Sequence, residues 1–175
     1  MSHLMLDLET LGNQSYSCIL SIAAVEFDIE TGEELSFFYK KISLESNLQL
    51  GLKINSSTLE WWMLQKPEVL RELFTFSEPI NSVLYDFQSY LTNFKLEGLW
   101  GNSARFDCGI LQNAYNKADI PLPWDFRKER CYRTFVEMFG QIDKTKYIGF
   151  AHNPLDDCRN QITTLMYTKN NLKYV

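Results

Sequence analysis

The stretch HLMLDLETLG places two carboxylates, those of Asp7 and Glu9, inside an apolar segment at the start of the sequence. Successive side chains of a β-strand point to opposite faces, so both acids lie on the same face of a strand over residues 3–9. Neighbouring carboxylates repel each other, and partial burial makes charging both of them more costly. The pair therefore indicates a site for a cation. The alternative is an edge strand whose outward acids prevent aggregation.

Two further segments contain residues that could join such a site. In GNSARFDCGIL, Asp107 follows a predicted strand, at the carboxyl end where α/β sheets bind ligands. In AHNPLDDCRNQI, His152 is followed five residues later by Asp157, at the start of a predicted helix. Each has a structural alternative, because acids often cap helices and a single histidine is more often structural than catalytic.

The segment HNPLDD offers two acids, Asp156 and Asp157, of which one is expected in the site. In an uninterrupted helix Asp156 would share a face with His152, since positions i and i+4 lie about 40° apart. Pro154 instead suits the first helical position, with Asn153 as the N-cap, which leaves His152 outside the helix. Asp156 then falls at the third helical position, where an acid caps the helix and complements its dipole. This assigns Asp157 to the site.

The composition is that of a globular protein. The 175 residues are 45% hydrophobic and 14% aromatic, which predicts one domain over residues 1–175 with a substantial core. The net charge of −5 argues against bulk electrostatic coating of nucleic acid, but it is compatible with an enzyme that grips a few nucleotides through metal ions. No apolar run reaches transmembrane length, and the early acids argue against a signal peptide. The four cysteines lack zinc-site spacing, so we expect free thiols and a cytoplasmic protein.

Strand patterns precede helical ones along the chain. Three strands are predicted over residues 3–9, 18–28 and 33–42, and Thr31-Gly32 predicts a hairpin that makes the second and third antiparallel. GLWGN is a fourth, short strand, and a fifth is expected near residues 130–132.

Helices are predicted in the rest of the chain. After a polar loop, one helix follows Ser56-Ser57-Thr58, a second begins at Pro67 and a third covers residues 78–94. ARFDCGILQNAYNKA forms a fourth helix, and a final helix follows AHNP. This order predicts an α/β fold in which one mixed sheet is flanked by helices.

In order, the motifs D-x-E, G-N-x-x-x-F-D and H-x-x-x-x-D resemble those of the DEDDh group of DnaQ-like 3′-5′ exonucleases. The resemblance covers nearly the whole chain. It is strongest to the small phage exonuclease A-like and exoribonuclease members, in which a segment like STLEWWMLQKPEV also follows the third strand. It implies an RNase H-like fold, with a mixed five-stranded sheet whose first three strands are antiparallel. Two positions depart from the family pattern: Pro154 replaces an alanine, and CYRT at 131–134 replaces an Asp-Thr pair.

The resemblance implies four acidic metal ligands and one general base, which are Asp7, Glu9, Asp107, Asp157 and, as the base, His152. Carboxylate oxygens suit Mg²⁺ or Mn²⁺. Two such ions, about 4 Å apart, stabilise the attacking and leaving oxygens of an in-line displacement, and Asp7 is expected to bridge them. A histidine with a pKa near ~6.5 can accept the proton of the attacking water at neutral pH.

Four residues are expected to contact the substrate: Thr10, Leu11, Trp61 and Trp62. The first two resemble residues that meet the terminal nucleotide in relatives. The two tryptophans point about 100° apart on a helix, so one is expected in the core while the other can stack on a terminal base. The basic cluster RKER with Arg133 is either a phosphate contact or a solvated face, and the solvated face is favoured.

The expected function is hydrolysis of single-stranded DNA or RNA from the 3′ end to nucleoside 5′-monophosphates. A catalytically silent nucleic-acid-binding module is a second hypothesis, but it predicts the loss of an acid, and all four are present. An RNase H-like endonuclease is a third, which His152 and the middle motif disfavour. The expected partners are single-stranded 3′ ends, and a homodimer follows by analogy with small relatives. The choice between DNA and RNA stays open.

Overall fold

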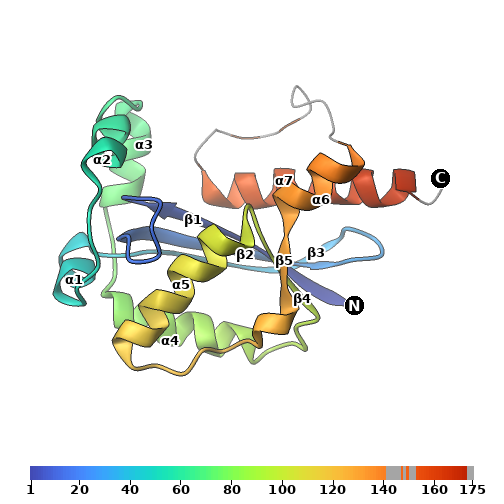
Figure 1. Cartoon of the computed structure of the whole chain (residues 1–175), viewed down its shortest axis with the longest axis horizontal. Coiled ribbons are helices and arrows are strands. Elements are labelled where there is room, and N and C mark those ends of the chain that lie inside the picture. The colour runs from blue at the N-terminus through green and yellow to red at the C-terminus, as the bar shows by residue number, and fades with distance from the viewer. Residues whose placement is uncertain (141–146, 148, 150–152, 173–175) are drawn as a thin grey trace.

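The computed structural model describes residues 1–140, 147, 149 and 153–172, and it shows a central sheet with helices on both faces (Figure 1). His152, the expected general base, lies outside the described residues. The strand order is β3-β2-β1-β4-β5. The strands are β1 Ser2–Thr10, β2 Ile19–Asp28, β3 Glu34–Lys41, β4 Gly98–Gly101 and β5 Glu129–Cys131. β1, β2 and β3 pair antiparallel, and β4 and β5 run parallel to β1, which confirms the predicted mixed sheet.

Seven α-helices lie in the described part of the chain. They are α1 Leu44–Gln49, α2 Ser56–Met63, α3 Pro67–Phe74, α4 Ile80–Leu91, α5 Ala104–Ala118, α6 Tyr132–Phe139 and α7 Pro154–Leu172. Helices α4 and α5 cover one face of the sheet and α6 and α7 the other, while α2 and α3 stand beside the carboxyl end of β1 (Figure 1). Among the described residues, no helix combines the length and the apolar character needed to cross a membrane.

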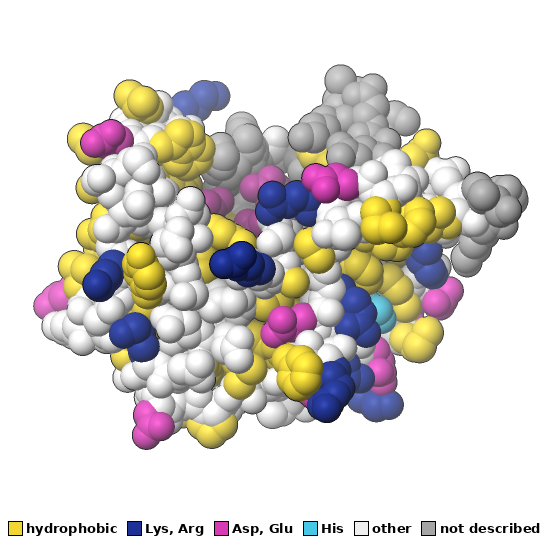
Figure 2. Space-filling view, viewed as in Figure 1, with side chains coloured by type: hydrophobic (Ala, Val, Ile, Leu, Met, Phe, Trp, Pro, Cys, Tyr) yellow, Lys and Arg dark blue, Asp and Glu magenta, His cyan; other side chains and the backbone are white. Residues whose placement is uncertain are grey.

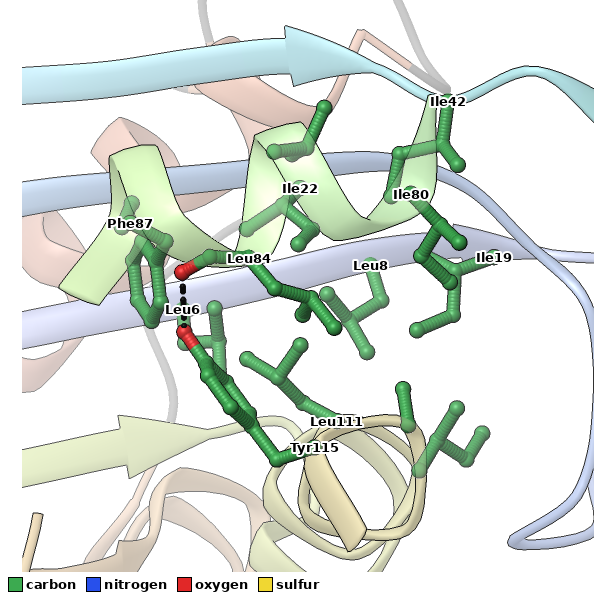
Figure 3. Packing of buried hydrophobic residues seen from close by; sticks show 14 of the residues in the cluster. Leu6, Leu8, Ile19, Ile22, Ile42, Ile80, Leu84, Phe87, Leu111 and Tyr115 are labelled. Carbon is green, nitrogen blue, oxygen red and sulfur yellow. Dashed lines mark hydrogen bonds between the residues drawn. The ribbon is translucent and has the colours of Figure 1, made fainter. Parts of the chain in front are cut away.

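The side chains of β1 alternate between two apolar cores. Leu6 and Leu8 are buried in the core on the side of α4 and α5, whereas Met5 is buried on the side of α7. Figure 3 shows the first core, where the Tyr115 hydroxyl of α5 donates a 2.8 Å hydrogen bond to the carbonyl of Leu84 in α4. Because a strand has a period of two, the acids of β1 share the face of Met5 and point towards α7.

Local sequence signals predict several boundaries correctly. Gly32 has a φ of +78° in the turn that joins β2 to β3. Helices α3 and α7 each begin at a proline, Pro67 and Pro154.

Helix α2 begins earlier than expected, because the Asn55 side chain provides the N-cap and accepts the Thr58 N–H at 3.2 Å.

Two helices differ from the prediction. Helix α1 occupies the expected polar loop, where the buried Asn47 side chain bonds both the N–H and the C=O of Ile19 at 2.8 and 2.9 Å. The fifth strand, β5, ends at Cys131, and α6 begins at Tyr132, where the strand was expected to end. Helix α6 forms because it buries Tyr132 and Val136 on one helical face. Both outcomes depend on contacts with segments distant in the sequence.

Candidate active site

Three carboxylates from β1 and α7 form one group. Asp7, Glu9 and Asp157 each offer an oxygen, and these oxygens lie within 4.8 Å of one another. Glu9 is 9% exposed, and the other two side chains are partly buried. Figure 2 shows acidic side chains gathered in a hollow of the molecular surface, beside a basic side chain. Hard oxygen ligands in this number and spacing can hold a divalent cation.

The N-terminus of α7 determines which of two adjacent acids joins the group. The Asn153 side chain accepts the backbone N–H groups of Leu155 and Asp156, both at 3.2 Å, so the helix is capped at this residue. Asp157 then lies in the first turn and reaches the two acids of β1. The carboxylate of Asp156 lies 3.8 Å from Arg159 instead.

Asp107 lies beside the group but is held by backbone donors. It is 2% exposed in the first turn of α5, where one carboxylate oxygen accepts the Leu8 N–H at 3.2 Å and the other accepts the Asn102 N–H at 2.7 Å. Gly101 permits this approach, because a Cβ atom there would lie 2.9 Å from the carboxylate. Among the described residues, the group of acids close enough together to hold a metal ion contains the other three and not Asp107.

Burial and mutual repulsion make the acids difficult to ionise. Burial, followed by the charges of Asp7, Asp157 and Asp107, raises the pKa of Glu9 to about 9. Burial and Asp157 raise the pKa of Asp7 to about 7, although a hydrogen bond from Gln161 opposes the shift. The pKa of Asp107 is also raised, by burial and by Asp7. A bound cation would offset this repulsion, which is the condition that the D-x-E pair predicts.

These shifts predict that Glu9 makes the metal-free protein less stable at high pH. The folded protein holds a proton on Glu9 up to about pH 9, whereas the unfolded chain releases it near 4.5. The free energy of unfolding that Glu9 contributes therefore falls as the pH rises through this window. We expect Glu9→Gln to raise the melting temperature relative to wild type at pH 8 but not at pH 4, in thermal melts followed by circular dichroism with a chelator present.

Asp86→Asn is the matched control, because this acid is 47% exposed on α4, away from the group. It should not reproduce the pH-dependent gain in melting temperature. An equal effect of Glu9→Gln at both pH values would contradict the raised pKa.

Two cavities meet the acids. The larger, of about 560 Å³, is lined by Asp7 and Asp157 and by residues that include Asn102, Tyr132, Arg133 and Gln161. The smaller, of about 210 Å³, is lined by Glu9 and by residues that include Thr10, Trp61, Trp62 and Phe106. An extended polymer that lies across these acids could therefore occupy both cavities.

The expected substrate contacts divide between the surface and the core. Trp61 is 42% exposed and packs edge-to-face on Trp62, with 4.9 Å between the ring centroids. Trp62 is 2% exposed, and its indole N–H donates to the carbonyl of Thr10 at 2.9 Å. Leu11 is fully buried. Trp61 is therefore the tryptophan that a ligand can stack on, whereas Trp62 and Leu11 fix the end of β1.

Gln161 is a site residue that the sequence motifs do not reveal. Its side-chain N–H donates to Asp7 at 3.1 Å, and its carbonyl oxygen is buried without a hydrogen-bond partner among the described residues. It lies four residues after Asp157 on α7, so both side chains share one helical face. That spacing is the only sequence signal that could have indicated it.

The cysteines adjacent to two of the acids are structural. Cys108 and Cys158 are fully buried, and burial raises the pKa of both thiols. The Cys158 thiol contacts the carbonyl of Met5 at 3.5 Å. Both pack as small apolar side chains, as the sequence predicts.

The chain is similar to known nucleases in sequence. The family model described as the 3′-5′ exoribonuclease Rv2179c-like domain matches residues 2–168. An exodeoxyribonuclease of Enterobacteria phage T4 is 25% identical over 202 residues, which cover 95% of this chain and 88% of the relative.

Solved structures share the fold. The nuclease domain of 3′hExo, a DEDDh family member bound to rAMP, aligns with a TM-score of 0.64 and 13% identity, covering 98% of this chain and 92% of that one. Cell-death related nuclease 4 (CRN-4) aligns with a TM-score of 0.68 and 19% identity, and this chain covers 64% of its length with 97% of its own. E. coli exonuclease I in complex with a 5cy-dT13 oligonucleotide aligns with a TM-score of 0.70 and 15% identity, over 99% of this chain and 41% of that one.

These likenesses confirm the predicted RNase H-like fold and the resemblance to the DEDDh exonucleases. Exonucleases of this type use divalent metal ions, and the described residues of this chain include a group of three acids that could hold one. The chain belongs to the 3′-5′ exoribonuclease Rv2179c-like family and is a hydrolytic nuclease of the 3′-5′ exonuclease type.

Proposed function

We propose that this protein removes nucleotides from the 3′ end of single-stranded DNA or RNA and releases nucleoside 5′-monophosphates, with two Mg²⁺ or Mn²⁺ ions. The observation that carries the proposal is the convergence of Asp7, Glu9 and Asp157 within 4.8 Å. The matching family is named for an exoribonuclease and the phage relative for an exodeoxyribonuclease, so RNA and DNA both stay as alternative substrates in this proposal. A homodimer, expected by analogy with small relatives, belongs to the same proposal and is tested by sedimentation.

The donor set fits divalent ions. Asp7, Glu9 and Asp157 would hold them, with Asp107 beside the group to help position the second. Such ions supply Lewis-acid stabilisation of the attacking and leaving oxygens. Gln161 keeps the Asp7 carboxylate in place through its 3.1 Å hydrogen bond. This bond orients the acid that the proposal places at the centre of the site.

His152 is the proposed general base. It follows from the third motif, where it immediately precedes the N-cap Asn153. A neutral imidazole accepts the proton of the attacking water at physiological pH. The scissile phosphorus then receives the water oxygen, and the 3′ oxygen of the shortened strand leaves.

The smaller cavity is the proposed binding site of the terminal nucleotide. It borders Glu9, and Trp61 and Phe106 contribute aromatic surface to its wall. Stacking on an aromatic ring tolerates every base, which suits an exonuclease that removes each nucleotide in turn.

We expect Trp61→Ala to raise KM about 5- to 160-fold with a smaller change in kcat, because base stacking contributes about 1–3 kcal/mol. Steady-state kinetics on a short linear oligonucleotide measures the effect. Phe74→Ala is the matched control, since Phe74 is also 42% exposed but lies on α3 outside the wall of the cavity. Equal KM values for the two variants would contradict the stacking role.

A labelled-substrate experiment tests the proposed function. Linear DNA and RNA oligonucleotides, labelled at the 5′ end to follow shortening or in the 3′-terminal nucleotide to identify the released product, and a circular single strand are incubated with Mg²⁺, with Mn²⁺ or with a chelator. We expect a ladder that shortens from the 3′ end, 5′-monophosphate products, no cleavage of the circle and no activity with the chelator. Cleavage of the circle would instead identify an endonuclease, and binding without cleavage a silent module.

A further inference from the structure

Arg133 differs from the other basic residues of its segment. Arg127 pairs with Asp125 at 3.4 Å, and Lys128 pairs with Glu97 at 2.9 Å. Arg127 and Lys128 thus each have a carboxylate partner, and neither lines the larger cavity. Arg133, on α6, lines the larger cavity together with Asp7 and Asp157.

The guanidinium of Arg133 bonds the same residue, Asn102, that bonds Asp107. Its Nη2 donates to the carbonyl of Asn102 at 3.3 Å, while the Asn102 N–H donates to Asp107 at 2.7 Å. Asn102 therefore contacts both the Arg133 guanidinium and the Asp107 carboxylate. A guanidinium has five N–H donors and matches phosphate geometry, so most of its donors stay available for an anion.

The arrangement of the two cavities indicates which part of a bound strand Arg133 would contact. In the proposed function, the terminal nucleotide occupies the smaller cavity, which Glu9 lines, and the scissile phosphate lies at Asp7, Glu9 and Asp157. The remaining strand then continues into the larger cavity, which Arg133 lines. The first phosphate of that strand inside the larger cavity is the one that lies one linkage upstream of the scissile phosphate.

We propose that Arg133 binds the phosphate one linkage upstream of the scissile one and thereby makes the enzyme favour substrates of three or more nucleotides. This proposal rests on the proposed function of the acidic group. Glu137 also lines the larger cavity and would repel a phosphate, so the proposal assigns the attraction to the guanidinium alone.

Short substrates that differ by one phosphate test the proposal. A dinucleoside monophosphate has only the scissile phosphate, whereas a trinucleoside diphosphate also has the upstream one. We expect Arg133→Ala to lower kcat/KM about 10- to 100-fold for the longer substrate, mainly through KM, and less than about twofold for the shorter one. Arg133→Lys should recover part of the loss, because it restores the charge without the fork of donors.

Salt dependence is the second readout. Loss of the phosphate contact should make kcat/KM for the longer substrate depend less steeply on salt concentration than in wild type, because salt screens the attraction between the guanidinium and the phosphate. Arg130→Ala is the matched control, since its guanidinium donates to the carbonyls of Arg127 and Glu129, and it should match wild type in both readouts.

An equal loss on both substrates would place Arg133 at the scissile phosphate and overturn the proposal, and so would no loss on either. If the wild-type protein cleaved neither of these substrates and also failed to cleave oligonucleotides of greater length, the proposed function itself would be wrong. This inference would then be wrong as well. Thermal melts of each variant establish that the fold is intact.

Discussion

Asp7→Asn is expected to abolish hydrolysis while leaving the metal-free protein as stable as wild type or more stable. Asp7 is one of three acids whose oxygens lie within 4.8 Å, and its pKa is raised to about 7 by burial and by Asp157. Removal of its charge relieves repulsion in the folded state. The asparagine oxygen can still accept the N–H of Gln161, so the contact between β1 and α7 is retained.

The expected loss in kcat is at least about 10³-fold, because metal coordination supplies several kcal/mol of transition-state stabilisation. Single-turnover kinetics measures it, and thermal melts with a chelator at pH 8 measure the stability. Asp86→Asn removes an exposed acid on α4 that pairs with Lys40 at 3.6 Å, so it should keep wild-type turnover and lose at most about 1 kcal/mol of stability. Near-normal turnover by Asp7→Asn would contradict the assignment of the acids to metal binding.

Asp157→Asn and Asp156→Asn form the second pair of expected results. The first variant should fold normally and lose nearly all activity, because Asp157 belongs to the acidic group. The second should stay active and lose about 1 kcal/mol of stability or less, because its carboxylate pairs weakly with Arg159 and complements the helix dipole. Adjacent positions with the same substitution control for any general effect on α7.

Calorimetric titration with Mn²⁺ separates the two variants without relying on turnover. Asp156→Asn should bind the ion with wild-type affinity, and Asp157→Asn should bind it more weakly. If Asp156→Asn lost both metal binding and activity while Asp157→Asn kept them, the reading of the third motif would be wrong.

The parts of the site that local geometry determines could be predicted from the sequence. Asp7 and Glu9 share a face because a strand has a period of two, and the antiparallel partner β2 holds that face towards α7. The N-cap at Asn153 places Asp157 in the first turn of α7, which follows from the proline after it. Both predictions depend on a few adjacent residues.

The remaining features depend on contacts between distant segments. Gln161 bonds Asp7 across 154 residues of sequence, and Asn47 stabilises α1 through Ile19 on β2. Helical periodicity places Gln161 on the same face as Asp157, but no periodicity indicates which residue of a distant segment either side chain bonds. Trp61 and Trp62 are adjacent and identical, so only the packing of α2 against the end of β1 decides which of them is buried.

The most direct test of the central claim is the position of a bound divalent ion. Crystals of the wild-type protein are soaked with Mn²⁺ and a nucleoside 5′-monophosphate, and anomalous diffraction locates the metal. We predict anomalous peaks that place Mn²⁺ ions within coordination distance of carboxylate oxygens of Asp7, Glu9 and Asp157. The phosphate of the nucleotide should bind an ion, and its base should stack on Trp61. Manganese bound elsewhere, with none at these three acids, would contradict the account.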